Sequence, residues 1–229
     1  MFPFPFSFIG SAIVPDVPVE RIANAEAMSF NGTDSCILVD NPPSLPGDAT
    51  ISLWTYFNNT PTHGGILGSK NFYVSANSFV LYNSSGDIFF GVGTNAGSFV
   101  SSTWTPSTAL LNNWNHICIV IDTTAQTVQP YFNGVSMGSP LNIGTRNISD
   151  ISNGMNISGY STNGQYPPTL RIMDGKIDEV AIFNTVLSAN KIQQIYNATA
   201  VVGGEVKTAN LFTGGLDTSL VYWNRMGDS

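Results

Sequence analysis

The sequence is poor in charged residues, and poorest in cations. Only 10% of its 229 residues are charged, and 8 Lys and Arg stand against 15 Asp and Glu, for a net charge of −7. A surface that binds nucleic acid needs clustered cations to neutralise phosphates. The sequence contains no such cluster, so we do not expect nucleic acid as a partner. Asn, Ser, Thr and Gly replace the missing charges, which indicates a neutral-polar surface.

Cysteine and long apolar runs are also scarce. Cys36 and Cys118 each stand in a strand-like apolar run, and we expect buried thiols that act as small hydrophobes. A disulfide between them would need a Cα separation that the sequence does not give. No run is long enough to span a bilayer, so we expect no membrane insertion. The apolar start, residues 1–10, lacks a basic region and contains prolines, so we expect it to belong to the mature protein and not to be a secretion signal.

Short apolar runs separated by turn residues are abundant between residues 25 and 198. Residues 50–57 alternate in polarity, as a half-buried strand does. Residues 71–82 and 87–92 predict a strand pair, and residues 114–122 predict a strand covered on both faces.

Turn and capping residues complete the local prediction. Asn133-Gly134 is the strongest short signal for a type I′ hairpin, so it predicts a meander of three strands. Ser188 is placed to cap one short helix, whose buried stripe would be Ile192, Ile195 and Tyr196. Many strands and one helix predict an all-β sandwich of two antiparallel sheets. We expect an N-terminal arm at 1–24, the sandwich at 25–198, and a linker (199–210) with a C-terminal tail (211–229).

Five motifs occur in order and resemble one known family. They are Ala27-Met-Ser-Phe-Asn-Gly32, Asp48-Ala-Thr-Ile-Ser-Leu-Trp54, Trp114-Asn-His-Ile-Cys-Ile-Val-Ile-Asp122, Tyr131-Phe-Asn-Gly-Val135 and Gly175-Lys-Ile-Asp-Glu-Val-Ala-Ile-Phe183. Together they resemble the concanavalin A-like lectin/glucanase superfamily in its laminin G-like branch, over residues 25–198. The resemblance implies a jelly-roll sandwich.

The two flanks carry a second resemblance. The Phe/Pro arm and the tail motif Leu220-Val-Tyr-Trp-Asn-Arg-Met-Gly-Asp228 are similar to laminin G-like proteins encoded among structural genes of aquatic tailed phages. The resemblance implies a virion protein. In such proteins the tail motif leads into more chain, so we expect that the sequence is processed, truncated or continued beyond Ser229.

The sequence lacks the acid pattern of the enzymatic relatives. Those that cleave β-glucans resemble one another in a Glu-x-Asp-x-x-Glu strand, whose carboxylates act as nucleophile and acid. Here the adjacent pair Asp178-Glu179 would point to opposite faces of a strand. His63 and His116 have no Ser, Asp or metal-ligand pattern nearby in the sequence. We therefore expect no catalytic residues and no enzyme.

Asp178 stands on a mostly apolar strand and needs polar partners if it is buried. One interpretation, which the resemblance permits, is a Ca²⁺ site formed by Asp178, Asn31, the Gly32 carbonyl and Asp34. The alternative is that Asp178 accepts backbone N–H bonds from the turn after the first strand. No other cofactor is expected.

Aromatic residues are the candidate glycan contacts. Tyr160 and Tyr166 lie in a Ser/Asn/Gly-rich stretch, as does Trp104, where an exposed ring could stack on a sugar. Trp54 and Tyr56 share one face of a strand. The alternative is that the loop aromatics only anchor their loops to the sandwich.

The arm carries a regular apolar pattern. Phe2, Phe4, Phe6 and Phe8 alternate with Pro3, Pro5 and Ser7, so an extended arm presents four rings on one side. Burying those rings could contribute about 6–12 kcal/mol before entropy is subtracted. The rings could fold back on their own domain or dock on a neighbouring subunit.

These observations give one leading hypothesis and one alternative. The leading hypothesis is a non-enzymatic virion structural protein at the particle surface, with capsid decoration preferred over a tail fibre. Its partners would be capsid or tail proteins and copies of itself. The alternative is an extracellular carbohydrate-binding or adhesion module that contacts host-surface glycans.

Overall fold

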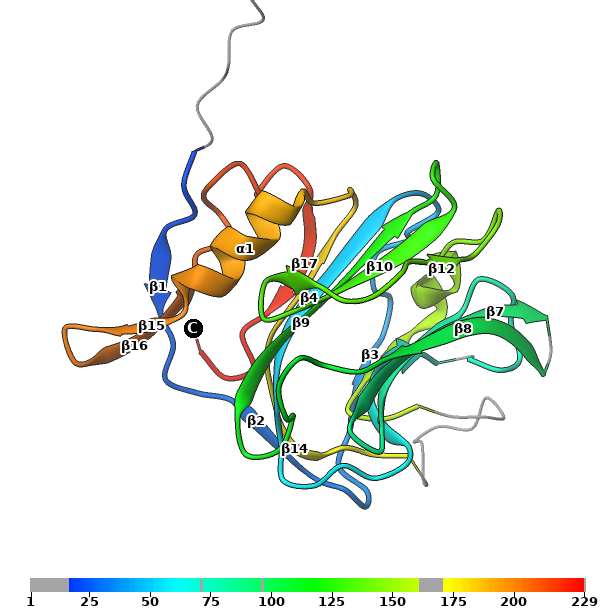
Figure 1. Cartoon of the computed structure of the whole chain (residues 1–229), viewed down its shortest axis with the longest axis horizontal. Helices are drawn as coiled ribbons and strands as arrows, with labels where there is room; N and C mark the ends of the chain where they lie inside the picture. Colours follow the sequence, from blue (N-terminus) through cyan, green and yellow to red (C-terminus); the bar gives the residue numbers. More distant parts are fainter. Residues whose placement is uncertain (1–16, 71, 96, 161–170, 229) are drawn as a thin grey trace, which may run out of the picture.

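The computed structural model describes residues 17–228 except 71, 96 and 161–170. Two antiparallel sheets pack face to face, and a smaller third layer covers part of the outer side of one of them (Figure 1). The predicted all-β sandwich is confirmed. Over the described residues, no helix is long and apolar enough to cross a membrane.

The larger sheet has eight strands. Its path is β11 (Val135–Ser136), β10 (Thr127–Phe132), β9 (Trp114–Asp122), β4 (Ala49–Phe57), β14 (Asp174–Phe183) and β17 (Leu220–Asn224), with β12 (Leu141–Asn142) on β10 and β2 (Met28–Asn31) on β14. The second sheet has six strands, in the order β3 (Ile37–Val39), β13 (Met155–Ile157), β5 (Gly64–Ser69), β6 (Phe79–Ser84), β7 (Asp87–Asn95) and β8 (Ser98–Trp104).

The third layer is built from segments near the two ends of the chain. It holds the helix α1 (Ala189–Ala198) and a three-stranded sheet of β1 (Arg21–Ala23), β16 (Glu205–Ala209) and β15 (Ala200–Val202). A short 3-10 helix, η1 (Ser149–Asn153), precedes β13. Figure 1 shows this layer on one side of the molecule and strands β7 and β8 on the other.

The main core lies between the two large sheets. Because successive strand residues point to opposite faces, alternate apolar residues of β4, β9, β14, β6 and β7 meet there. They include Ile51, Leu53, Ile117, Ile119, Ile177, Ile182, Phe79, Leu81, Ile88 and Phe90, all fully buried.

Strand β9 is buried on both faces, as its sequence predicts. Its Cys118 and Val120 point away from the main core and join a second cluster with Phe183 and with Ile192 and Ile195 of α1. The third layer therefore explains why this strand carries no polar face. Cys36 is only half-buried, unlike Cys118, and no disulfide joins the two.

Local signals match the structure at the hairpin and the helix start. Asn133 and Gly134 have φ values of 50° and 80°, as a type I′ turn requires. The Ser188 hydroxyl accepts the Lys191 amide, which caps α1. The strand predicted over residues 71–82 is shorter, because β6 begins only at Phe79.

The segment predicted as a linker and tail is folded onto the domain. Residues 200–209 form the β15–β16 hairpin, which turns at Gly203 and Gly204 with φ values of 63° and 86°. Strand β17 pairs with β14 from Val180 to Phe183. How the chain divides into separate folding units stays a prediction.

Candidate functional site

An aromatic pocket lies on the outer face of the six-stranded sheet. Strands β6 and β7 turn Leu81 and Phe90 toward the main core, so their neighbours Tyr82 and Phe89 face outward, paired across the hairpin. Together with the loops at one end of the sheet they enclose about 410 Å³, a space lined by His63, Phe72, Tyr73, Tyr82, Phe89, Phe99, Tyr160 and Arg171. We call this space the aromatic pocket.

Two glycines of β5 allow the segments around Tyr160 and Arg171 to lie close against the sheet. The Gly65 amide donates to the Arg171 carbonyl at 3.1 Å, and Gly65 forms a bridge with Ile172. A Cβ on Gly65 would meet that carbonyl and would lie 2.7 Å from Gly159 Cα. A Cβ on Gly68 would lie 3.4 Å from the Tyr160 Cβ. Glycine at these positions therefore brings the tyrosine and the arginine into the pocket.

The pocket rings stack into a continuous aromatic surface. The Tyr82 ring lies between Phe89, at a centroid distance of 4.2 Å, and Tyr160, at 5.2 Å, both nearly parallel to it. Phe72 packs edge-on against Tyr160. The Arg171 guanidinium donates to the Tyr160 hydroxyl at 2.7 Å and lies over its ring. These contacts fix the orientation of the tyrosine, while Phe99 on β8 is 36% exposed at the margin.

Burial and Arg171 set the charge of the pocket. Burial raises the pKa of Tyr160 to about 12, so its hydroxyl stays protonated at neutral pH. Burial, with the nearby Arg171 charge, lowers the pKa of His63 below its ordinary value. Among the lining residues named above, Arg171 therefore carries the charge at neutral pH. A protein of net charge −7 has a cationic aromatic pocket.

The structure separates the aromatic residues that the sequence offered as glycan contacts. Tyr160 is in the pocket, but it is 3% exposed and not the open loop residue expected. Trp104 ends β8, is 6% exposed and donates its indole N–H to the Ser139 carbonyl, so the expected loop position is wrong. Tyr166 lies outside the described residues.

Trp54 and Tyr56 lie on the other large sheet. Trp54 is buried against Tyr196 of α1, and the half-buried Tyr56 packs edge-on against Trp114. A role of any of these residues in glycan contact stays a prediction. Sequence reasoning did not single out Tyr82, Phe89, Phe99 or Arg171.

A serine and a histidine far apart in the sequence meet inside the larger sheet. Ser52 on β4 and His116 on β9 are buried, with 2.8 Å between Oγ and Nε2. Burial lowers the pKa of His116 to about 3, and its Nδ1 atom has no hydrogen-bond partner. The pair was not foreseen from the sequence. It lacks the third group that orients a catalytic histidine, and Trp54 covers the ring at 5.2 Å.

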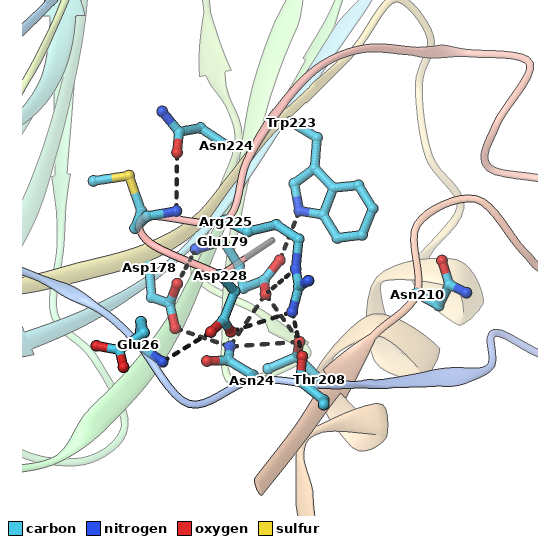
Figure 2. A network of polar contacts seen from close by, with 12 residues as sticks. Asn24, Glu26, Asp178, Glu179, Thr208, Asn210, Trp223, Asn224, Arg225 and Asp228 are labelled. Carbon is cyan, nitrogen blue, oxygen red and sulfur yellow. Dashed lines mark hydrogen bonds and ion pairs between the residues drawn. The ribbon is translucent and has the colours of Figure 1, made fainter.

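Asp178 and Glu179 belong to a polar network that joins segments near both ends of the described chain (Figure 2). We call it the terminal clasp. The Asn24 amide, just after β1, donates to Asp178 Oδ2 at 2.9 Å and to Glu179 Oε1 at 3.1 Å. Thr208 of β16 donates to the same Glu179 oxygen at 3.0 Å. Trp223 of β17 donates to Glu179 Oε2 at 2.6 Å. Two buried carboxyl groups thus hold together β1, β14, β16 and β17.

The C-terminal residues close the clasp. The Asp228 carboxylate accepts the backbone amides of Ala25, at 3.0 Å, and Glu26, at 3.1 Å. Arg225 forms ion pairs with Glu179 and Asp228 and also donates to the Ala23 carbonyl. Figure 2 shows Arg225 between the two carboxyl groups.

A β-bulge overturns the predicted geometry of the acidic pair. Asp178 and Glu179 were expected on opposite faces of a strand, yet both accept from the same Asn24 amide. The register of β14 against β4 shifts between Asp178 and Ala181, and Glu179 has a φ of 50°. The extra residue breaks the two-residue alternation and turns both carboxyl groups to one side.

The candidate calcium ligands are not brought together. Strand β2 places Asn31 opposite Asp174, which is about 13 Å along an extended strand from Asp178. The Asn31 side chain instead bonds within its own turn, to Asp34 and to the backbone amide of Thr33. Within the part of the chain that is described, no group of three or more His, Cys, Asp or Glu side chains could hold a metal ion. Calcium binding stays a prediction that this geometry does not support.

Sequence and structure comparisons agree with this architecture. A family model described as the concanavalin A-like lectin/glucanases superfamily, from its laminin G group, matches residues 30–193. The chain belongs to this superfamily. A comparison with curated protein sequences finds no match.

Solved structures of the superfamily fold are similar at low identity. The CBM40 domain of the Ruminococcus gnavus IT-sialidase aligns with a TM-score of 0.62 and 15% identity, over 75% of this chain and 97% of that domain. The heptameric SAP-like pentraxin of Limulus polyphemus aligns with a TM-score of 0.56 and 16% identity, over 80% of this chain and 83% of the pentraxin. A putative carbohydrate-binding protein of Bacteroides ovatus aligns with a TM-score of 0.59 and 14% identity, over 93% and 53% of the two chains. These similarities establish the fold.

Replacing Gly65 with alanine should destabilise the domain and deform the aromatic pocket. The new Cβ would meet backbone atoms of Gly159 and Arg171, which cannot rotate away. Overpacking of this kind costs about 1–3 kcal/mol. Gly47→Ala is the matched control, because a Cβ there meets nothing within 4 Å. Urea denaturation of both variants measures the difference, and equal midpoints would contradict the close crossing.

The terminal clasp should make stability depend on pH. Burial raises the pKa of Asp178 from 3.8 to about 7, and the Glu179 charge adds to the rise. A pKa raised in the folded state gives stability that is complete below about pH 4 and is lost as the pH rises through 7. At about 1.4 kcal/mol per pKa unit, the loss over the whole range is on the order of 4 kcal/mol.

Asp178→Asn should flatten this profile, because the amide is neutral at every pH. Thermal unfolding from pH 5 to pH 8 checks it, with the exposed Asp217→Asn as the control. A variant that keeps the wild-type pH dependence would show that Asp178 is not the titrating group.

Proposed function

We propose that the chain is a non-enzymatic glycan-binding module whose ligand lies in the aromatic pocket. The observation that carries this proposal is the accessible ring pair of the half-buried Phe89 and the 36% exposed Phe99, which stands next to the buried rings of Tyr82 and Tyr160 and beside Arg171. Sugar rings present apolar C–H faces that pack on aromatic rings, while their hydroxyl groups need a few well-placed polar partners. A space of about 410 Å³ accommodates one or two sugar residues.

The charge of the pocket narrows the ligand class. Arg171 is the lining residue that is charged at neutral pH, and a guanidinium binds carboxylate or sulfate groups through paired hydrogen bonds. The ligand is therefore a glycan that carries an acidic sugar. The fold similarity lends support, because a CBM40 structure of the Ruminococcus gnavus IT-sialidase is described as bound to α2,3 sialyllactose.

The carboxyl groups of the terminal clasp support a binding function over catalysis. Both oxygens of Glu179 accept hydrogen bonds from the protein, from Trp223 and from Asn24 and Thr208. A general acid has to reach the bond that it protonates, whereas Glu179 is buried in the clasp. No role in hydrolysis is proposed for this pair.

Phe89→Ala should weaken glycan binding about five- to tenfold, because it removes one ring of the stack and about 1–1.5 kcal/mol of aromatic contact. A glycan array with neutral, sialylated, uronate and sulfated members identifies the ligand, and titration calorimetry measures the change. Val201→Ala is the control, since that side chain is 72% exposed on β15 and lines neither this pocket nor any groove described below. Arg171→Gln should reduce the preference for acidic glycans. No binding to any glycan, or binding unaffected by Phe89→Ala, would refute the proposal.

We also propose that the module is a structural protein of a virion, as its flanks suggest. The similarity of the arm and tail to phage structural proteins supports this role, and so does the series Phe2, Phe4, Phe6 and Phe8, which lies outside the described residues. The partners are capsid or tail proteins and further copies of the chain, with capsid decoration preferred over a tail fibre. Outside a virion, the module acts as an extracellular protein.

Deleting residues 2–14 should abolish attachment to particles and leave the sandwich folded. The described contacts of the domain begin at Val17, so the deletion leaves every one of them in place. Mass spectrometry of purified particles measures incorporation, and circular dichroism of the isolated variant checks the fold. Normal incorporation of the deleted chain would overturn the docking role of the arm.

A further inference from the structure

Two unpaired strand edges face each other across a groove. Strand β17 is the last strand on its side of the eight-stranded sheet, and β1 is the last strand of the three-stranded sheet. In the described part of the chain no strand pairs with the outer edge of either. Between them lies a groove of about 650 Å³, lined by Ile22, Phe212, Leu220, Val221, Tyr222, Trp223, Asn224, Arg225 and Asp228. We call it the edge groove.

The edge groove is mainly apolar and partly open to solvent. Phe212 is 67% exposed and packs edge-on against Trp223 at 5.1 Å. The five residues of β17 are all half-buried. An unpaired edge strand with apolar side chains is a template for another strand. The groove therefore suits an extended, uncharged segment.

The arm of this chain has the matching composition. Residues 1–15 contain no charged side chain. In an extended segment each residue directs its N–H and C=O to one edge, and the next residue directs them to the other. The four phenylalanines therefore present their N–H groups along one edge, while Pro3 and Pro5 remove two donors from the opposite edge. Such a segment can pair with β17 and is a poor template for a further strand on its outer side.

The exit of the arm favours a second copy over the same domain. The first described residues lie beside the groove, because Glu20 donates to the Thr213 hydroxyl, next to Phe212. Pro15 and Pro18 favour extended conformations for the residues before them. No glycine occurs between residues 11 and 24 to allow a tight reversal. Extended, residues 1–16 reach about 50 Å, which is enough to reach a neighbouring molecule.

We propose that the edge groove receives the Phe/Pro arm of a second copy of this chain by strand addition to β17. The contact is heterologous, so it generates closed rings or open chains of subunits. It does not rest on glycan binding. It deepens the docking role of the arm proposed above by assigning a receptor within the chain itself.

A complementation experiment with purified full-length proteins tests the proposal. One variant carries Phe2, Phe4, Phe6 and Phe8→Ser and keeps the groove; the other carries Phe212→Lys and Val221→Lys and keeps the arm. The wild type should associate in sedimentation velocity, and each variant alone should associate at least tenfold more weakly. When mixed, the two variants should form a one-to-one complex that grows no further. The mixture offers one functional arm and one functional groove per pair of molecules, and the complex uses both.

Val201→Lys is the matched control, because Val201 is 72% exposed on β15 and outside the groove. It should associate as the wild type does. Circular dichroism confirms that every variant is folded, and binding to a glycan array is measured in parallel, so loss of association and loss of glycan binding are separable.

Three results would overturn the proposal. The first is a wild type that stays monomeric at every concentration tested. This result includes the case in which the arm docks on its own domain, which would show as protection of the β17 amides from hydrogen exchange in the monomer. The second is a groove variant that associates as strongly as the wild type. The third is a mixture of the two variants that yields no complex. If the chain is incorporated into particles but does not self-associate, the arm is still a docking segment, and its receptor is another protein.

Discussion

The arrangement of the chain ends depends on satisfying two carboxyl groups that the bulge of β14 buries. Buried charge or polarity without hydrogen bonds is costly, and Asp178 and Glu179 find their partners on β1, β16 and β17. Meeting this requirement draws segments from both termini onto the back of the larger sheet. That layer in turn covers the second face of β9 and forms one wall of the edge groove.

Much of the sandwich could be read from the sequence because its signals are local. Alternation over 50–57, the doubly apolar run at 114–122 and the Asn133-Gly134 turn each depend on neighbouring residues alone. Ser188 predicted the start of α1 in the same way, as a local N-cap signal. Five such motifs in order were enough to reveal the superfamily.

The candidate site was harder to foresee because it depends on register and on a change of alternation. Tyr82 and Phe89 meet only through the two-residue turn of the β6–β7 hairpin. The bulge at Glu179 has no clear mark in the sequence, and it reverses the side on which a carboxyl group points. Gly203-Gly204 is a hairpin-turn signal, but the composition of the residues around it resembles a linker, so the β15–β16 hairpin was not predicted. Ser52 and His116 meet only because β4 and β9 pair.

Because the terminal clasp gathers both ends of the described chain into one layer, the domain has two distinct poles. Val17 and Asp228 belong to the side of α1 and β1, whereas Phe89 and Phe99 stand on the β7–β8 side (Figure 1). A molecule tethered through its termini would hold its aromatic face outward, away from whatever surface carries it. For the same reason, a fluorophore or fusion protein intended to leave the aromatic pocket clear belongs at the exposed tip of the β15–β16 hairpin, which lies in the layer that holds β1 and α1.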